Sequence, residues 1–151
     1  MKVGDICQRA VVTARPLDEL LSAARVMRDK HIGYLIVVEP GIAQCGLKPV
    51  GVLTDRDLVV TVMAREADPR RLLVADVMTR ELVAACEDDS LGAALAQMRR
   101  IGVRRLPVIG DHGELVGVLS LDDAIDALAK ELGAVAGSIR SEQVAERILR
   151  S

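Results

Sequence analysis

The sequence predicts a mixed α/β fold that consists of two successive β-α-β-β-α units. The first observation is an internal repeat, in which residues 71 positions apart match, as Met27 and Met98 do. The second is a motif that recurs as "GVLTDRDL" at residues 51–58 and "GVLSLDDA" at 117–124. The third is hydrophobic periodicity, which changes between strand-like and helix-like spacing in the same order in both copies.

The first unit is expected at residues 1–66. "AVVT" at residues 10–13 predicts a short strand. The helix that follows has apolar residues at helical spacing on one face, namely Leu17, Leu20, Leu21, Ala24 and Met27. Two β-branched runs, residues 34–38 and 50–54, predict strands joined by a loop with proline and glycine. A second helix is expected from Asp55 through residue 66.

The second unit is expected at residues 76–132 and repeats this order. It begins with a strand at residues 82–85, and the next helix is expected to be capped by Asp88 or Asp89. The apolar face of that helix carries Leu91, Ala94, Leu95 and Met98. Strands at 105–109 and 115–119 flank the turn "GDHG", and a last helix runs from 121 to 132.

The segments outside the two units are predicted to be short. Residues 67–75 contain Pro69 and read as a linker. Residues 133–151 form a tail in which a short helix is expected after Gly137, because Val144 and Ile148 lie four positions apart. This tail would pack on the core or on a second subunit.

The amino-acid composition limits the kinds of partner that this chain is expected to bind. A formal net charge of −2 argues against a surface that gathers nucleic acid or an anionic membrane. Aromatic residues make up 1% of the chain, too few for a base-stacking platform. No apolar run is long enough to span a bilayer, and the N-terminus lacks the apolar core of a signal peptide, so a cytoplasmic protein is expected.

The sequence offers little for catalysis or metal binding. It has no HExxH, GxSxG, P-loop or GxGxxG motif, so an enzyme is not expected. Cys7, Cys45 and Cys86 show no CxxC spacing and are expected to be reduced thiols. His31 and His112 lack a second ligand at zinc-site spacing, and no metal site is predicted. A metal or redox sensor that uses Cys45 and His31 is a weaker alternative.

The recurring motif places Thr54-x-x-Asp57 and Ser120-x-x-Asp123 where a strand passes into a helix. This spacing is typical of a capping box, which needs no ligand. A carboxylate has several acceptor sites, however, and can also receive the hydroxyl groups of a ribose. The two roles are compatible.

The ordered set of motifs resembles a tandem pair of cystathionine-β-synthase (CBS) domains over roughly residues 3 to 130. The resemblance is carried by "DVMT" at 76–79, its weaker partner "DICQ" at 5–8, "RRLPVI" at 104–109, and the two glycine-led strands. It implies two halves packed about a pseudo-twofold axis with two clefts between them. Family members commonly bind adenosyl compounds there, such as AMP, ADP, ATP or S-adenosylmethionine.

The resemblance also implies two unequal clefts. The stronger one, the Asp57 cleft, would contain Thr54, Arg56, Asp57, Leu82, Val83, Arg104, Arg105 and Pro107. Its arginines suit phosphate, because guanidinium groups stay charged and present a fork of donors. The weaker one, the Asp123 cleft, would contain Ser120, Asp123, Val12, Thr13, Gly33 and Tyr34. It lacks the two arginines and is expected to be empty, to bind weakly, or to hold an adenosyl ligand with fewer phosphates.

These observations favour a non-catalytic regulatory module that binds an adenosyl ligand and signals its occupancy to an effector protein. The resemblance implies a homodimer. The alternative is a structural or protein-interaction module in which the two motifs are only capping boxes.

Overall fold

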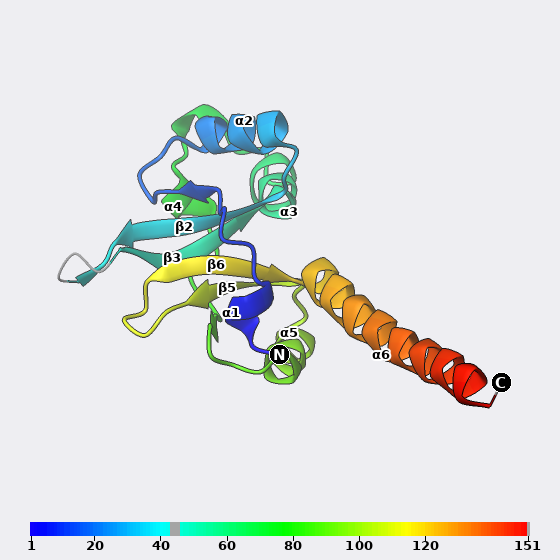
Figure 1. Cartoon of the computed structure of the whole chain (residues 1–151). Coiled ribbons are helices and arrows are strands. Elements are labelled where there is room, and N and C mark those ends of the chain that lie inside the picture. The colour runs from blue at the N-terminus through cyan, green and yellow to red at the C-terminus, as the bar shows by residue number, and fades with distance from the viewer. Residues whose placement is uncertain (43–45, 151) are drawn as a thin grey trace.

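Two three-stranded sheets, one in each repeat, form the centre of the molecule (Figure 1). The computed structural model describes residues 1–42 and 46–150. In each sheet a short first strand pairs in parallel with the second strand, which pairs antiparallel with the third. The third strands, β3 (Leu47–Thr54) and β6 (Leu115–Ser120), contact each other between the repeats. This arrangement is the mixed fold of two β-α-β-β-α units that the sequence predicts.

The first repeat follows the predicted order with longer second and third strands. Its elements are β1 (Thr13–Ala14), α2 (Leu20–Lys30), β2 (Tyr34–Pro40), β3, α3 (Asp55–Asp57) and the π-helix η2 (Leu58–Met63). The helix expected after Asp55 is therefore mostly π-helical. Leu17, expected on the buried face of α2, precedes the helix and is 77% exposed, whereas Leu20, Ala23 and Met27 are buried.

The second repeat has β4 (Ala85–Cys86), α5 (Leu91–Ile101), β5 (Arg105–Ile109), β6 and α6 (Leu121–Leu149). The N-cap of α5 is Ser90, whose hydroxyl accepts from the Ala93 amide at 3.1 Å. The expected cap, Asp89, instead accepts from the Cys86 amide at 2.8 Å and closes the turn before the helix.

Each repeat completes its core with a segment from the other. The short helix α4 (Val74–Val77) belongs to the second repeat by sequence, but Val74, Val77 and Met78 are buried in the core of the first. Conversely, Val3 of α1 (Val3–Ile6) and Cys7 are buried in the core of the second repeat. Figure 1 shows α4 in the same half of the molecule as β2 and β3, and α1 in the same half as β5 and β6, where it contacts β4 and β6. The linker expected at residues 67–75 contains η3 (Pro69–Arg71) and overlaps the first two residues of α4.

The exchanged segments cross the third strands through paired backbone hydrogen bonds. Thr79 and Val52 exchange two N–H···O=C bonds of 2.9 and 3.0 Å, and Gln8 and Val118 exchange two of 2.9 Å. Gly51 permits the first crossing, because a Cβ there would lie 2.7 Å from the Thr79 carbonyl oxygen. Gly117 has the same role at the second crossing. Matching contacts of this kind relate the repeats by a pseudo-twofold axis.

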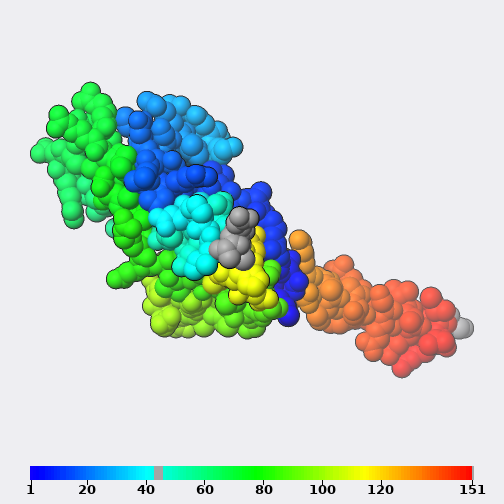
Figure 2. Space-filling view, turned by 90° about the vertical axis from the view of Figure 1, so that its left-hand side faces the viewer, coloured from blue at the N-terminus to red at the C-terminus, as the bar shows by residue number. Residues whose placement is uncertain are grey.

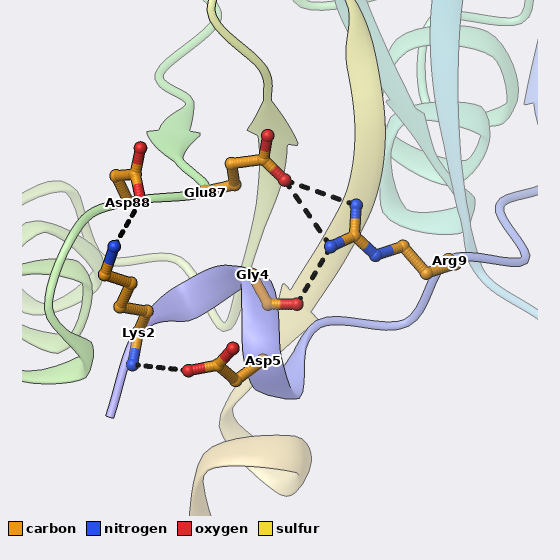
Figure 3. A network of polar contacts seen from close by, with 6 residues as sticks. All are labelled: Lys2, Gly4, Asp5, Arg9, Glu87 and Asp88. Carbon is orange, nitrogen blue, oxygen red and sulfur yellow. Dashed lines mark hydrogen bonds and ion pairs between the residues drawn. The ribbon is translucent and has the colours of Figure 1, made fainter.

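Ion pairs at the surface also tie the N-terminal segment to the second repeat (Figure 3). Lys2 Nζ lies 2.6 Å from Asp88, and Arg9 donates to the Gly4 carbonyl at 2.9 Å while one guanidinium nitrogen lies 3.4 Å from Glu87. These side chains are largely exposed, so water and salt screen their attraction. Burial of Val3 and Cys7 therefore anchors the segment more strongly than these pairs do.

The tail is part of one continuous helix of 29 residues, α6, rather than a separate short helix after Gly137. It leaves the globule as an arm (Figures 1 and 2). Gly133 and Gly137 do not break it, because glycine costs a helix only about 1 kcal/mol relative to alanine. Residues 128–150 are exposed throughout, so the tail does not pack on the core of its own chain.

Gly51→Ala tests the close crossing of the Thr79 backbone over β3. The added methyl group must displace the Thr79 backbone, so the free energy of unfolding should fall by about 1–3 kcal/mol. Urea unfolding measures this change. Gly133→Ala is the matched control, because a Cβ at Gly133 meets nothing within 4 Å, and it should leave stability equal or slightly higher. Equal stability of wild type and Gly51→Ala would contradict the tight crossing.

Candidate functional site

Both strand-to-helix motifs form capping boxes, as the sequence predicts. The Thr54 hydroxyl accepts from the Asp57 amide at 3.2 Å, and Asp57 Oδ2 accepts from the Thr54 amide at 2.8 Å. In the second repeat the Ser120 hydroxyl accepts from the Asp123 amide at 3.1 Å, and Asp123 Oδ2 accepts from the Ser120 amide at 2.9 Å. Each carboxylate is thus held at the end of a third strand.

A cleft of about 480 Å³ opens beside Asp57, between the two repeats. All eight residues expected in the Asp57 cleft line it, namely Thr54, Arg56, Asp57, Leu82, Val83, Arg104, Arg105 and Pro107. The segment before β4 supplies apolar surface through Leu82 and Val83, which are partly buried. The cleft therefore combines a carboxylate, an apolar wall and three guanidinium groups.

Gly33 and Tyr34 also line the Asp57 cleft, although the sequence analysis assigned them to the other one. They match Arg104 and Arg105 in the repeat, and all four residues meet in one cleft. The Arg105 guanidinium lies 5.9 Å from the centroid of the Tyr34 ring, within reach of a cation–π contact. Burial raises the pKa of the Tyr34 hydroxyl, although Arg105 opposes this shift, so the ring stays neutral at physiological pH.

Two acidic residues that the sequence analysis missed line the same cleft, Asp55 and Glu81. Asp55 Oδ1 accepts from the Arg56 amide at 2.8 Å, and the Asp55 amide donates to the Gly33 carbonyl at 3.0 Å. A Cβ at Gly33 would lie 2.3 Å from Asp55 Oδ2. Asp55 begins α3 directly after Thr54, a position that could have suggested its place in the cleft.

The two motif aspartates differ in the oxygen that faces away from the cap. Asp123 Oδ1 accepts from the side-chain amide of Gln8 at 2.9 Å. Within the described part of the chain, Asp57 Oδ1 accepts no hydrogen bond. The residue that matches Gln8 in the repeat is Thr79, which lines the Asp57 cleft but makes no such bond. One carboxylate is therefore available to a ligand, and the other is already engaged.

Hydrogen bonds from Ser120 and Gln8 lower the pKa of the Asp123 carboxyl group. Burial alone would raise the pKa of this carboxyl, but hydrogen bonds from Ser120 and Gln8, with a smaller contribution from the charge of Arg105, hold the pKa below its usual range. The Ser120 hydroxyl lies 2.6 Å from Asp123 Oδ2. The ionised carboxylate is thus stabilised by the protein itself.

The structure does not bring the six residues of the expected Asp123 cleft together. Asp123 lines a hollow between α1 and the start of α6, which Ser120, Val12 and Thr13 do not line. Thr13 lies in β1, and Val12 packs against the first core. Acidic side chains dominate this hollow, with Lys130 as its one cationic side chain among Asp5, Asp123, Asp126 and Glu131. Such a surface repels phosphate.

The described residues give little support to the metal alternative. No three His, Cys, Asp or Glu side chains gather there into a possible metal site. His31 caps α2 in the left-handed conformation, with φ of 54°, as Gly102 does for α5. Cys45 lies outside the described residues. No helix in residues 1–42 or 46–150 has both the length and the apolar character needed to cross a bilayer.

Residues 3–64 and 74–130 both match the model of the CBS domain. The chain belongs to the CBS domain family. CBS domain-containing protein YhcV of Bacillus subtilis is 33% identical over 85% of this chain and 87% of its own length. Uncharacterized protein MK0525 of Methanopyrus kandleri is 30% identical over 83% of this chain, which spans 61% of that relative.

Among solved structures, the CBS domain pair of protein MJ0100 has the same fold, with a TM-score of 0.71 at 23% identity over 87% of this chain and 98% of that one. That pair was crystallised in complex with 5′-methylthioadenosine and S-adenosyl-L-methionine. The tandem CBS pair is a regulatory module, and this chain contains one such pair.

Gln8→Thr tests the bond that engages Asp123, because it installs the residue found at position 79. The pKa of Asp123, measured by NMR titration, should rise in the variant. At neutral pH the variant should lose about 0.5–1.5 kcal/mol of stability. The difference should shrink as the pH falls through the wild-type pKa of Asp123, since a depressed pKa stabilises the fold only above it. Gln97→Thr is the control, because the Gln97 side chain donates to the Ala84 carbonyl and not to Asp123. An unchanged Asp123 pKa in Gln8→Thr would refute the bond.

Proposed function

We propose that this CBS pair is a non-catalytic sensor that binds one adenosyl ligand, of the AMP, ADP or ATP type or S-adenosylmethionine, in the Asp57 cleft. The observation that carries this proposal is the oxygen of Asp57 that the capping box leaves without a partner among the described residues. A vicinal diol can donate to this oxygen without disturbing the helix cap.

The other walls of the cleft suit the remaining parts of such a ligand. Leu82, Val83 and Pro107 offer apolar surface to an adenine ring, and Arg104 and Arg105 offer donors to phosphate or carboxylate. Asp55 and Glu81 bring negative charge to the same cleft. Because three arginines face three acidic residues, we expect few phosphates to be favoured, and AMP is the first candidate ligand.

Occupancy by one ligand per chain follows from the difference between Gln8 and Thr79. A ribose at Asp123 would have to displace the Gln8 amide and would enter an acidic hollow. This solvent-exposed hydrogen bond contributes about 0.5–1.5 kcal/mol, and its loss opposes binding by that amount. Thr79 imposes no such cost at Asp57.

The signal would be a change in the balance between arrangements of the two repeats. A ligand in the Asp57 cleft touches both repeats and stabilises the arrangement in which they fit it together. A second copy of the chain in a homodimer, or an effector protein, would read the difference. We place this binding in the cytoplasm, where adenine nucleotides are abundant and the Cys7 and Cys86 thiols would stay free.

Calorimetric titration with AMP, ADP, ATP and S-adenosylmethionine tests the ligand site. We expect Asp57→Asn to weaken the binding of the best ligand at least tenfold, because it removes the charged acceptor, and Asp123→Asn to stay within about twofold of wild type. Circular dichroism checks that both variants fold. Failure of all four compounds to bind would overturn the proposal and favour an interaction module in which the motifs are only caps.

Thr79→Gln tests why the clefts differ. A glutamine at this position should reach the open oxygen of Asp57, as Gln8 reaches Asp123, and weaken binding about tenfold or more. Thr79→Ser is the control for the loss of threonine and should bind within about threefold of wild type. Wild-type affinity in Thr79→Gln would show that the residue at this position does not control access.

A further inference from the structure

Tyr34 and Arg105 occupy equivalent positions in the two repeats, and they contact each other. They lie 71 positions apart, the spacing of the repeat, and the Arg105 guanidinium lies 5.9 Å from the centroid of the Tyr34 ring. Two equivalent residues can meet only near the axis that relates the repeats. A cation therefore faces an aromatic ring beside this axis, where two arginines would repel each other and two tyrosines would supply no charge.

The strand register determines where both side chains begin. Tyr34 is the first residue of β2 and pairs with Thr54, and Arg105 is the first residue of β5 and pairs with Ser120. Residues that pair across antiparallel strands share one face of the sheet. Each side chain therefore starts beside the capping hydroxyl group of its own repeat, and both line the Asp57 cleft.

Arg105 is not paired with any of the acidic side chains that share its cleft. Asp55, Asp57 and Glu81 line this cleft, but in the described part of the chain the Arg105 side chain forms no ion pair and no hydrogen bond. Its contact is with the Tyr34 ring. The N–H donors of the guanidinium are therefore available to an anionic ligand.

The Tyr34 ring is suited to hold a cation without neutralising it. The residue is half-buried, and burial raises the pKa of its hydroxyl group, although Arg105 opposes this shift, so the ring carries no charge at physiological pH. A carboxylate in its place would occupy the N–H donors of Arg105, whereas a neutral ring attracts the guanidinium through its π face. Tyr34 is also the only Phe, Tyr or Trp residue of the chain.

We propose that Tyr34 positions Arg105 for the phosphate of the ligand, so that the Asp57 cleft selects a phosphorylated adenosyl compound over the nucleoside. This inference rests on the proposed function of the same cleft. Tyr34 is a positioning residue, because it acts through Arg105. Without the ring, Arg105 is free to pair with Asp55 or Glu81, and the cleft keeps its ribose and adenine contacts but loses part of its contact with phosphate.

The ratio of AMP affinity to adenosine affinity, measured by calorimetry, isolates the contribution of the phosphate. We expect Tyr34→Leu to lower this ratio at least about threefold, because the cation–π contact is lost, and to keep adenosine binding within about twofold of wild type. Tyr34→Phe is the matched control, since it keeps the ring and removes the hydroxyl group, and its ratio should stay within about twofold of wild type.

An Arg105→Gln background tests whether Tyr34 acts through Arg105. Arg105→Gln alone should lower the ratio at least as much as Tyr34→Leu does, and adding Tyr34→Leu should lower it no further. A further loss in the double variant, or an equal loss in Tyr34→Phe, would overturn the proposal.

The same titrations separate this inference from the proposed function. Intact adenosine binding with an unchanged ratio in Tyr34→Leu would overturn the role of Tyr34 alone. Failure of the wild type to bind both AMP and adenosine would overturn the proposed nucleotide site, and the role of Tyr34 with it. Retained adenosine binding in Tyr34→Leu also shows that this variant folds.

Discussion

The backbone crossings of residues 78–79 over β3 and of residues 7–8 over β6 are the contacts on which the rest of the molecule depends. They require glycine at positions 51 and 117, and they carry Val74, Val77 and Val3 into the core of the opposite repeat. Neither repeat has a complete core without the other. The crossings also bring Thr79 and Gln8 to the ends of the third strands, beside the two motif aspartates.

The chemistry of the Asp57 cleft depends on how the two carboxylate oxygens of the motif aspartate are used. The aspartate of each motif accepts from the amide of the N-cap residue, and only one of its oxygens is needed for that bond. What happens to the other oxygen depends on the crossing segment. A glutamine engages it in one half of the molecule, and a threonine leaves it open in the other. Two nearly symmetric halves thus present unequal surfaces.

The repeat and the two capping boxes could be predicted from the sequence because they depend on local spacing. Thr54, Asp57, Ser120 and Asp123 form the predicted boxes. The contact between Gln8 and Asp123 spans 115 positions, and no local pattern indicates it. Gly33 and Tyr34 were assigned to the other cleft because sequence matching does not show that the ends of β2 and β5 meet. The sequence analysis ends the last helix at residue 132, before Gly133, whereas the structure continues α6 to Leu149.

The exchange of segments between the repeats also constrains how the chain folds during synthesis. Val3 and Cys7 are synthesised long before Leu106, Val108 and Leu119, with which they share a core. The first repeat likewise lacks part of its core until Val74 to Met78 have emerged. Contacts so distant in sequence slow folding, since chain entropy must be lost before they form. Val3 and Cys7 therefore stay exposed until the second repeat is nearly complete, and an unfinished chain is open to aggregation during this interval.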